Sequence, residues 1–220
     1  MNNRSVIAPL GLLVAAALAC SPTSVLPGAT ALYKDDFSDT GSGWCVDSNA
    51  SSSTNYGGGE YIIKITDPNL VVWCNPGQTF DNIHVQVTAK NTSSKSDTVF
   101  GLICNDQKAA TQADESFYFM GITAGGNYTI RLSQAGKDKV LAEDKSKAIT
   151  TNAISYTLGA DCAGGNLALY VDGAQIASAH DATYATGDVG LFAWTGDGAP
   201  AEVHFDDLVV TKLASATPTP

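Results

Sequence analysis

Residues 83–90, Ile83-His84-Val85-Gln86-Val87-Thr88-Ala89-Lys90, alternate apolar and polar side chains almost without interruption. Successive side chains of a β-strand point to opposite faces of a sheet, so such alternation is typical of a strand with one buried face. The stretch therefore predicts a strand that packs one of its faces against a core.

The same pattern recurs on both sides of this stretch. We expect further strands at Glu60–Ile65, Leu70–Cys74, Thr98–Cys104, Ser116–Ile122, Tyr128–Ser133, Ile154–Ala160, Leu167–Val171, Gln175–Ala179, Val189–Trp194 and Val203–Thr211. Hairpin turns are expected at 124–127 and 171–174, where glycine can adopt a positive φ. Only 140–149 leaves room for a helical turn, and we favour a strand and loop there. About a dozen strands without a repeat predict an all-β fold, a two-sheet antiparallel β-sandwich of jelly-roll type, in one domain over residues 32–212.

Matching acidic motifs open and close this domain. Asp35-Asp36-Phe37 stands at its start and Phe205-Asp206-Asp207 at its end. We expect the two ends to be neighbours in one sheet, with both phenylalanines pointing inward. Chain closure is the simple role for the motifs. The alternative is a structural Ca²⁺ site built from Asp36, Asp206, Asp207 and backbone carbonyls, because Ca²⁺ needs several oxygen ligands at close range.

The N-terminus has the features of an export signal. One positive charge precedes an apolar run at 6–18, which is shorter than the roughly twenty residues a membrane span needs. We therefore predict a signal peptide over 1–19. Ala17-Leu18-Ala19-Cys20 fits ordinary signal peptidase cleavage, and it also fits a bacterial lipobox with Cys20 lipidated, although Ala17 stands where that motif usually has Leu. Of five cysteines, lipidation of Cys20 leaves four that can all pair, which favours the lipoprotein.

Composition narrows the location and the partners. Residues 20–31 are expected to form a flexible tether and 213–220 a disordered Thr/Pro-rich tail. A net charge of −10 argues against nucleic acid and anionic membrane surfaces as partners. We expect an exported monomer, lipid-anchored on the extracellular side, that contacts the membrane only through its lipid. A polar surface with few charges suits contact with carbohydrate.

The order of several short motifs resembles a known family. The motifs are Asp35–Asp39, Gly43-Trp44, Gly59–Tyr61, Gly101–Cys104, Phe117–Phe119, Gly126–Tyr128, Leu167–Gly173, Gly187–Leu191 and Phe205–Asp207. Together they resemble the concanavalin A-like (LamG and laminarinase-like) jelly-roll domains of bacterial surface lipoproteins. The resemblance implies a fold and a broad habit of binding glycans or surface components.

The sequence departs from the catalytic members of that superfamily. Their glucanases carry Glu-x-Asp-x-x-Glu on one strand, and no such run occurs here. The nearest segment, 202–206, has His204 where the middle acid should stand, and Asp114-Glu115 lacks a third alternating carboxylate. There is also no nucleophile elbow and no Cys-x-x-Cys, and the three histidines are scattered, so neither a serine hydrolase nor a zinc site is expected.

In the related pattern Cys104 and Cys162 lie at strand ends, which implies a disulfide between neighbouring strands. Cys45 and Cys74 each follow a tryptophan, and we expect them to form the second disulfide. Four cysteines allow three pairings, so the connectivity stays open. Trp44 and Trp73 are expected to shield the disulfide beside them.

A glycan would stack on exposed aromatic rings, with Asp, Asn or Gln taking its hydroxyls. The candidate ligand-binding residues are Trp194, Asp197, Tyr118, Asn127, Tyr128 and Trp73. Trp194 is the first choice, because Gly196 and Gly198 should expose its loop. The alternative for each aromatic residue is packing in the core or at an edge.

These observations favour a non-catalytic cell-surface lipoprotein that binds a glycan or another envelope component. Two alternatives stay open: a structural or protein-interaction envelope domain without a small ligand, and an atypical glycoside hydrolase. No catalytic residue and no cofactor other than Ca²⁺ is predicted.

Overall fold

The computed structural model describes residues 30–213. The predicted signal peptide, the lipidation site at Cys20, most of the tether and the tail after 213 lie outside these residues. Within the described part, no helix is long and apolar enough to cross a membrane.

The described residues form sixteen strands and one short 3₁₀ turn, η1. The elements are β1 (Ala31–Asp35), β2 (Asp47–Ser48), β3 (Ser52–Gly57), β4 (Glu60–Ile65), β5 (Val71–Cys74), β6 (Phe80–Asp81), β7 (Ile83–Asn91), β8 (Val99–Gln107), η1 (Gln112–Asp114), β9 (Ser116–Thr123), β10 (Asn127–Gln134), β11 (Lys137–Lys145), β12 (Tyr156–Ala163), β13 (Asn166–Val171), β14 (Ala174–His180), β15 (Thr186–Trp194) and β16 (Ala201–Lys212). The predicted strands are present. The polar strand β3 was missed, because only Thr54 and Tyr56 in it are buried.

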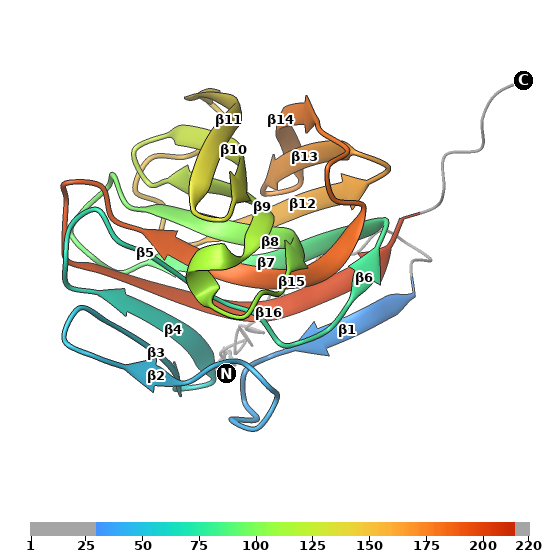
Figure 1. The fold of residues 1–220 in the computed structure, drawn as a ribbon. Helices are drawn as coiled ribbons and strands as arrows, with labels where there is room; N and C mark the ends of the chain where they lie inside the picture. The colour runs from blue at the N-terminus through green and yellow to red at the C-terminus, as the bar shows by residue number, and fades with distance from the viewer. Residues whose placement is uncertain (1–29, 214–220) are drawn as a thin grey trace, which may run out of the picture.

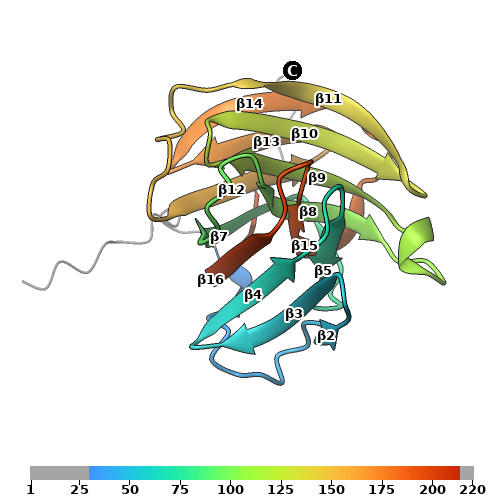
Figure 2. The ribbon, with the colours of Figure 1, turned by 90° about the vertical axis from the view of Figure 1, so that its left-hand side faces the viewer.

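These strands form two antiparallel sheets that face each other (Figure 1). The nine-stranded sheet has the order β14-β13-β12-β7-β16-β4-β3-β2, with β1 also paired to β16; the seven-stranded sheet has the order β11-β10-β9-β8-β15-β5, with β6 paired to β15. Figure 2 shows β10 and β11 beside β13 and β14 at one end of the sandwich, with β2, β3 and β4 at the other. The all-β sandwich expected from the sequence is confirmed.

Strand alternation builds the core between the sheets. The apolar residues of β7 are fully buried, whereas the polar residues between them are partly exposed. The two ends of the domain meet as expected: β1 pairs with β16, with Asp35 opposite Leu208. Phe37 and Phe205 are both 1% exposed and belong to the main core.

Both expected disulfides, Cys45–Cys74 and Cys104–Cys162, are present. Cys162 lies at the end of β12 as expected, one residue before its last, but Cys104 lies inside β8, and the two strands are not neighbours in one sheet. Strand β8 continues to Gln107 past an irregularity after Cys104, and β12 continues to Ala163. Because β8 and β12 belong to different sheets, this disulfide crosses the core and joins the two sheets.

Candidate functional site

The outward face of the seven-stranded sheet carries a second apolar layer. Phe117 and Phe119 alternate along β9 with Tyr118 and Met120, so the phenylalanines point away from the main core. The layer consists of Ile103, Phe117, Phe119 and Phe192, with Trp73, Val99 and Trp194 partly buried against it. We call these seven residues the outer aromatic cluster. Trp73, Val99 and Trp194 are its partly exposed members.

A hollow of about 490 Å³ lies beside this cluster and is bounded by β8, β9, β10, β11 and the end of β15. Trp194 lines it from β15, Asn127 and Arg131 from β10, and Glu143 and Lys145 from β11. An aromatic ring, an amide and charged side chains therefore meet in one concave place, the combination expected at ligand sites.

Two glycines leave room at the centre of this face. Gly101 and Gly121 are directly opposite each other on β8 and β9, and Phe192 is opposite Gly101 on β15. A Cβ atom on Gly121 would lie 2.6 Å from the Phe100 carbonyl oxygen and 2.7 Å from Cζ of Phe192. Glycine at 121 therefore leaves space for the tip of the Phe192 ring, which reaches from β15 past β8 to β9.

Arg131 spans this hollow. Its guanidinium carbon lies 5.2 Å from the centroid of the Trp194 ring, within the range of a cation–π contact. Its Nη2 donates to Glu143 at 2.8 Å, and its Nε donates to Thr129 Oγ1 at 2.9 Å. These three contacts fix both the arginine and one face of the indole.

The structure brings together three of the six predicted ligand-binding residues. Trp194, Asn127 and Tyr128 line the same hollow, although the Tyr128 ring also packs against the main core. Asn127 Nδ2 donates to Thr123 Oγ1 at 3.1 Å. Trp73 lies on the same sheet face as Trp194 and belongs to the outer aromatic cluster.

Two predicted residues are placed elsewhere. Tyr118 is fully buried on the inward face of β9, where its hydroxyl donates to Asp181 at 2.8 Å, so a platform role for Tyr118 is wrong. Asp197 is exposed, accepts a hydrogen bond from Asn69, and does not line the hollow. Arg131 was not predicted from the sequence. A single cation in a strand of alternating residues has the same sequence pattern as an ordinary solvent-facing residue.

The same sheet face contains a group of acids. Asp106 on β8 is directly opposite Asp188 on β15, and the two residues are 3% and 2% exposed. Burial raises the pKa of Asp106 to about 7, and the nearby charges of Glu115 and Asp188 add to this rise. Burial also raises the pKa of Asp188. Glu115 Oε2 accepts a hydrogen bond from the Trp73 indole at 2.9 Å.

The three predicted calcium ligands do not all line one hollow. Asp36 and Asp207 line a shallow pocket at the β1–β16 junction, but Asp206 does not. Hydrogen bonds from Ser38 lower the pKa of Asp36, whereas desolvation raises that of Asp206. Among residues 30–213, no three His, Cys, Asp or Glu side chains are grouped so that they could hold a metal ion. Calcium binding stays a prediction, and a melting temperature unchanged by chelator would contradict it.

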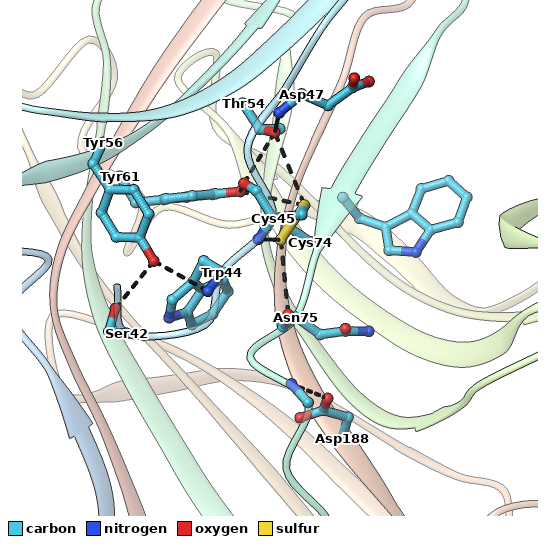
Figure 3. The surroundings of a disulfide bond; sticks show 12 residues. Ser42, Trp44, Cys45, Asp47, Thr54, Tyr56, Tyr61, Cys74, Asn75 and Asp188 are labelled. Carbon is cyan, nitrogen blue, oxygen red and sulfur yellow. Dashed lines mark hydrogen bonds between the residues drawn. A yellow bond between two sulfur atoms is a disulfide. The ribbon is translucent and has the colours of Figure 1, made fainter. Parts of the chain in front are cut away.

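The Cys45–Cys74 disulfide connects the first loop to β5 (Figure 3). Trp44 is buried beside it, with its indole N–H donating to Asp35 at 2.9 Å. Trp73 does not share this shielding role: Cys74 points into the main core, and Trp73, one residue earlier on the strand, points outward. Asn75 continues from Cys74 toward the acids, and its Nδ2 donates to Asp106 Oδ2 at 2.5 Å.

Comparison with known proteins gives the fold. No protein-family model matches the sequence, and no curated protein matches it. Solved structures similar to this chain include a carbohydrate-binding module of the CBM66 family from Bacillus subtilis, at 17% identity and a TM-score of 0.60, covering 78% of this chain and 96% of that one. A protein of unknown function with a galectin-like fold, also from Bacillus subtilis, has 13% identity and a TM-score of 0.65, covering 85% and 99%. A β-glucanase from Bacillus licheniformis has 13% identity and a TM-score of 0.61, covering 86% and 100%. The chain therefore has the concanavalin A-like jelly-roll fold expected from its motifs.

Proposed function

We propose that this protein is an exported, lipid-anchored surface protein whose sandwich domain binds a glycan without hydrolysing it. The observation that carries the proposal is the hollow beside the outer aromatic cluster, where the half-exposed indole of Trp194 stands next to amide and charged side chains. Indole rings provide flat apolar surfaces for the faces of sugar rings, and polar groups around them can bind hydroxyls.

The accessible margin of this apolar layer supports binding over a purely structural role. Ile103, Phe117, Phe119 and Phe192 are 0–4% exposed and form a second buried layer, whereas Trp73 and Trp194 keep part of their indole surface accessible beside it. The similarity to a carbohydrate-binding module and a β-glucanase is consistent with a glycan as the ligand, although similarity in fold alone is analogy.

The geometry of the acids favours binding without hydrolysis. Glycosidases place two carboxyl groups in contact with the sugar on either side of the scissile bond. Here Asp106 and Asp188 are 3% and 2% exposed, which leaves them little surface for contact with a sugar.

A glycan array probed with the mature protein tests the proposal. We expect the wild type to retain at least one glycan and Trp194→Ala to lose most of this binding. Tyr170→Ala is the matched control, because Tyr170 is a partly buried aromatic residue that lines a hollow on the other sheet. If no glycan is retained, or if both variants bind as the wild type does, the hollow lined by Trp194 is not the binding site. A protein that does not carry the glycan but binds the mature domain would instead support the alternative function, a protein-interaction domain.

A further inference from the structure

Asp106 and Asp188 lie opposite each other on the outward face of the seven-stranded sheet, but their carboxyl groups differ in hydrogen bonding. Asp188 has partners for both of its oxygens: its Oδ2 accepts from the Gly77 N–H at 2.7 Å, its Oδ1 accepts from the Val189 N–H at 2.9 Å, and the Lys108 ammonium lies 3.8 Å away. Asp106 accepts one hydrogen bond, from Asn75, and its buried Oδ1 has no partner among the described residues. Like charges directly opposite each other across two strands destabilise a sheet, so the pair favours a neutral Asp106.

Asp106 is connected to Trp73 from two directions. Asn75, its hydrogen-bond partner, lies two residues after Trp73. Glu115, whose charge acts on Asp106, accepts the hydrogen bond from the Trp73 indole. A change of charge on Asp106 therefore acts on both the strand and the acceptor that hold Trp73.

Glu115 also ends the segment 108–115 between β8 and β9, which carries the turn η1. Figure 2 shows this yellow-green turn projecting from the seven-stranded sheet. Gln112 of the turn and Trp73 line the same hollow, of about 420 Å³. The position of the segment consequently decides how much of Trp73 is accessible from that hollow.

The groups that act on Asp106 come from three places: Asn75 after β5 donates to it, Asp188 on β15 lies opposite it, and the charges of Lys108 and Glu115 act on it from the segment after β8. Three acids thus face one lysine, and that lysine is exposed. Ionisation of Asp106 adds a second negative charge opposite Asp188 and a repulsion toward Glu115.

We propose that Asp106 is a pH-sensitive latch: when neutral it lets Glu115 hold segment 108–115 against Trp73, and when ionised it releases this segment and exposes the indole. The latch rests on the proposed function, because Trp73 and Trp194 belong to the same outer aromatic cluster, and it adds regulation to that surface. Acidification keeps Trp73 covered, and a rise through neutral pH uncovers it.

The test follows the Trp73 indole N–H by NMR in the ¹⁵N-tryptophan-labelled mature protein between pH 5.5 and 8.5, with signals assigned by Trp73→Phe and Trp194→Phe. We expect the wild-type Trp73 signal to shift with a midpoint near 7 and Asp106→Asn to keep it at its acidic position throughout. Asp114→Asn removes an exposed acid from the same segment and is expected to titrate like the wild type.

Glu115→Gln provides a second test, because it keeps an acceptor for Trp73 while removing one of the charges that raise the pKa of Asp106. The midpoint should fall below that of the wild type, measured at the Trp73 indole N–H. A Trp73 signal that does not shift, or one that titrates equally in Asp106→Asn, overturns the latch. The NMR titration contains no glycan, so its result does not depend on whether the hollow lined by Trp194 binds one. The glycan array alone tests that binding.

Discussion

Replacement of Asp106 by asparagine should stabilise the protein at neutral pH and do so less as the pH falls. Because Asp106 is 3% exposed, its charge is poorly solvated. Its pKa rises from 3.8 to about 7 in the folded protein, which corresponds to about 4 kcal/mol. Between these two values the unfolded chain releases the proton while the folded protein keeps it, so the unfolding free energy of the wild type falls as the pH rises.

Asparagine has nearly the same shape and stays neutral, so the variant lacks this contribution. The unfolding free energy of Asp106→Asn minus that of the wild type should therefore increase by about 4 kcal/mol from pH 4 to pH 8, with most of the increase below 7. The measurement is urea unfolding followed by tryptophan fluorescence at four pH values, with disulfides intact. Asp114→Asn, which removes an exposed acid from the neighbouring segment, is the control variant measured in parallel. A constant difference for Asp106→Asn would refute the reasoning, because it would mean that Asp106 is ionised in the fold over the whole range.

Four further outcomes follow from the sequence and the structure. Cys20→Ser should lose fatty-acid labelling and move from the membrane to the soluble fraction; unchanged fractionation would rule out the anchor. Replacing Cys104 and Cys162 with alanine should lower the unfolding free energy by about 4 kcal/mol, the chain-entropy value for their separation of 58 residues; urea unfolding with the Cys45–Cys74 disulfide intact is the measurement, and an unchanged unfolding free energy would contradict it. Gly121→Ala should cost about 1–3 kcal/mol, because its Cβ would meet the Phe100 carbonyl oxygen and the Phe192 ring, and a melting temperature equal to the wild type would contradict the packing described. Asp181→Asn should destabilise the protein at pH 7 but progressively less below pH 4, because hydrogen bonds from Thr183 and Tyr118 hold the pKa of this carboxyl well below its usual range; pH-resolved unfolding checks the sign.

Local alternation was sufficient to predict most of the fold, because a half-buried strand records its buried face in every second residue. It gave β7 directly, and the matching ends of the chain gave the pairing of β1 with β16. The same rule was uninformative at Phe117-Tyr118-Phe119, where all three side chains can be buried. Only the hydrogen-bond partner in the folded protein shows which side chain points inward. Asp181 accepts a hydrogen bond from the Tyr118 hydroxyl, so the tyrosine points inward and the two phenylalanines point outward.

The candidate site was harder to predict than the fold because it depends on strand order. Arg131 and Trp194 are 63 positions apart and meet because β10, β9, β8 and β15 are consecutive in the sheet. No local pattern records that order. Trp194 could be chosen from the glycines that follow it, whereas an arginine in an alternating strand indicates only an exposed position.

The other sheet shows that a buried carboxyl group with one unpartnered oxygen, as in Asp106, is not a general property of this sandwich. On the outward face of the nine-stranded sheet, Asp161 uses both oxygens: Oδ1 lies 2.6 Å from His84 Nδ1, and Oδ2 accepts from the Tyr170 hydroxyl at 2.7 Å. Asp106 is more buried than Asp161, yet one of its oxygens has no partner. A buried carboxyl group without full hydrogen bonding costs stability. Asp161 shows that this sandwich can provide hydrogen-bond partners for both oxygens of a partly buried carboxyl group. The exception lies beside the outer aromatic cluster, the surface for which a binding role is proposed, and this coincidence is the reason to regard Asp106 as part of the site's regulation rather than as a defect of packing.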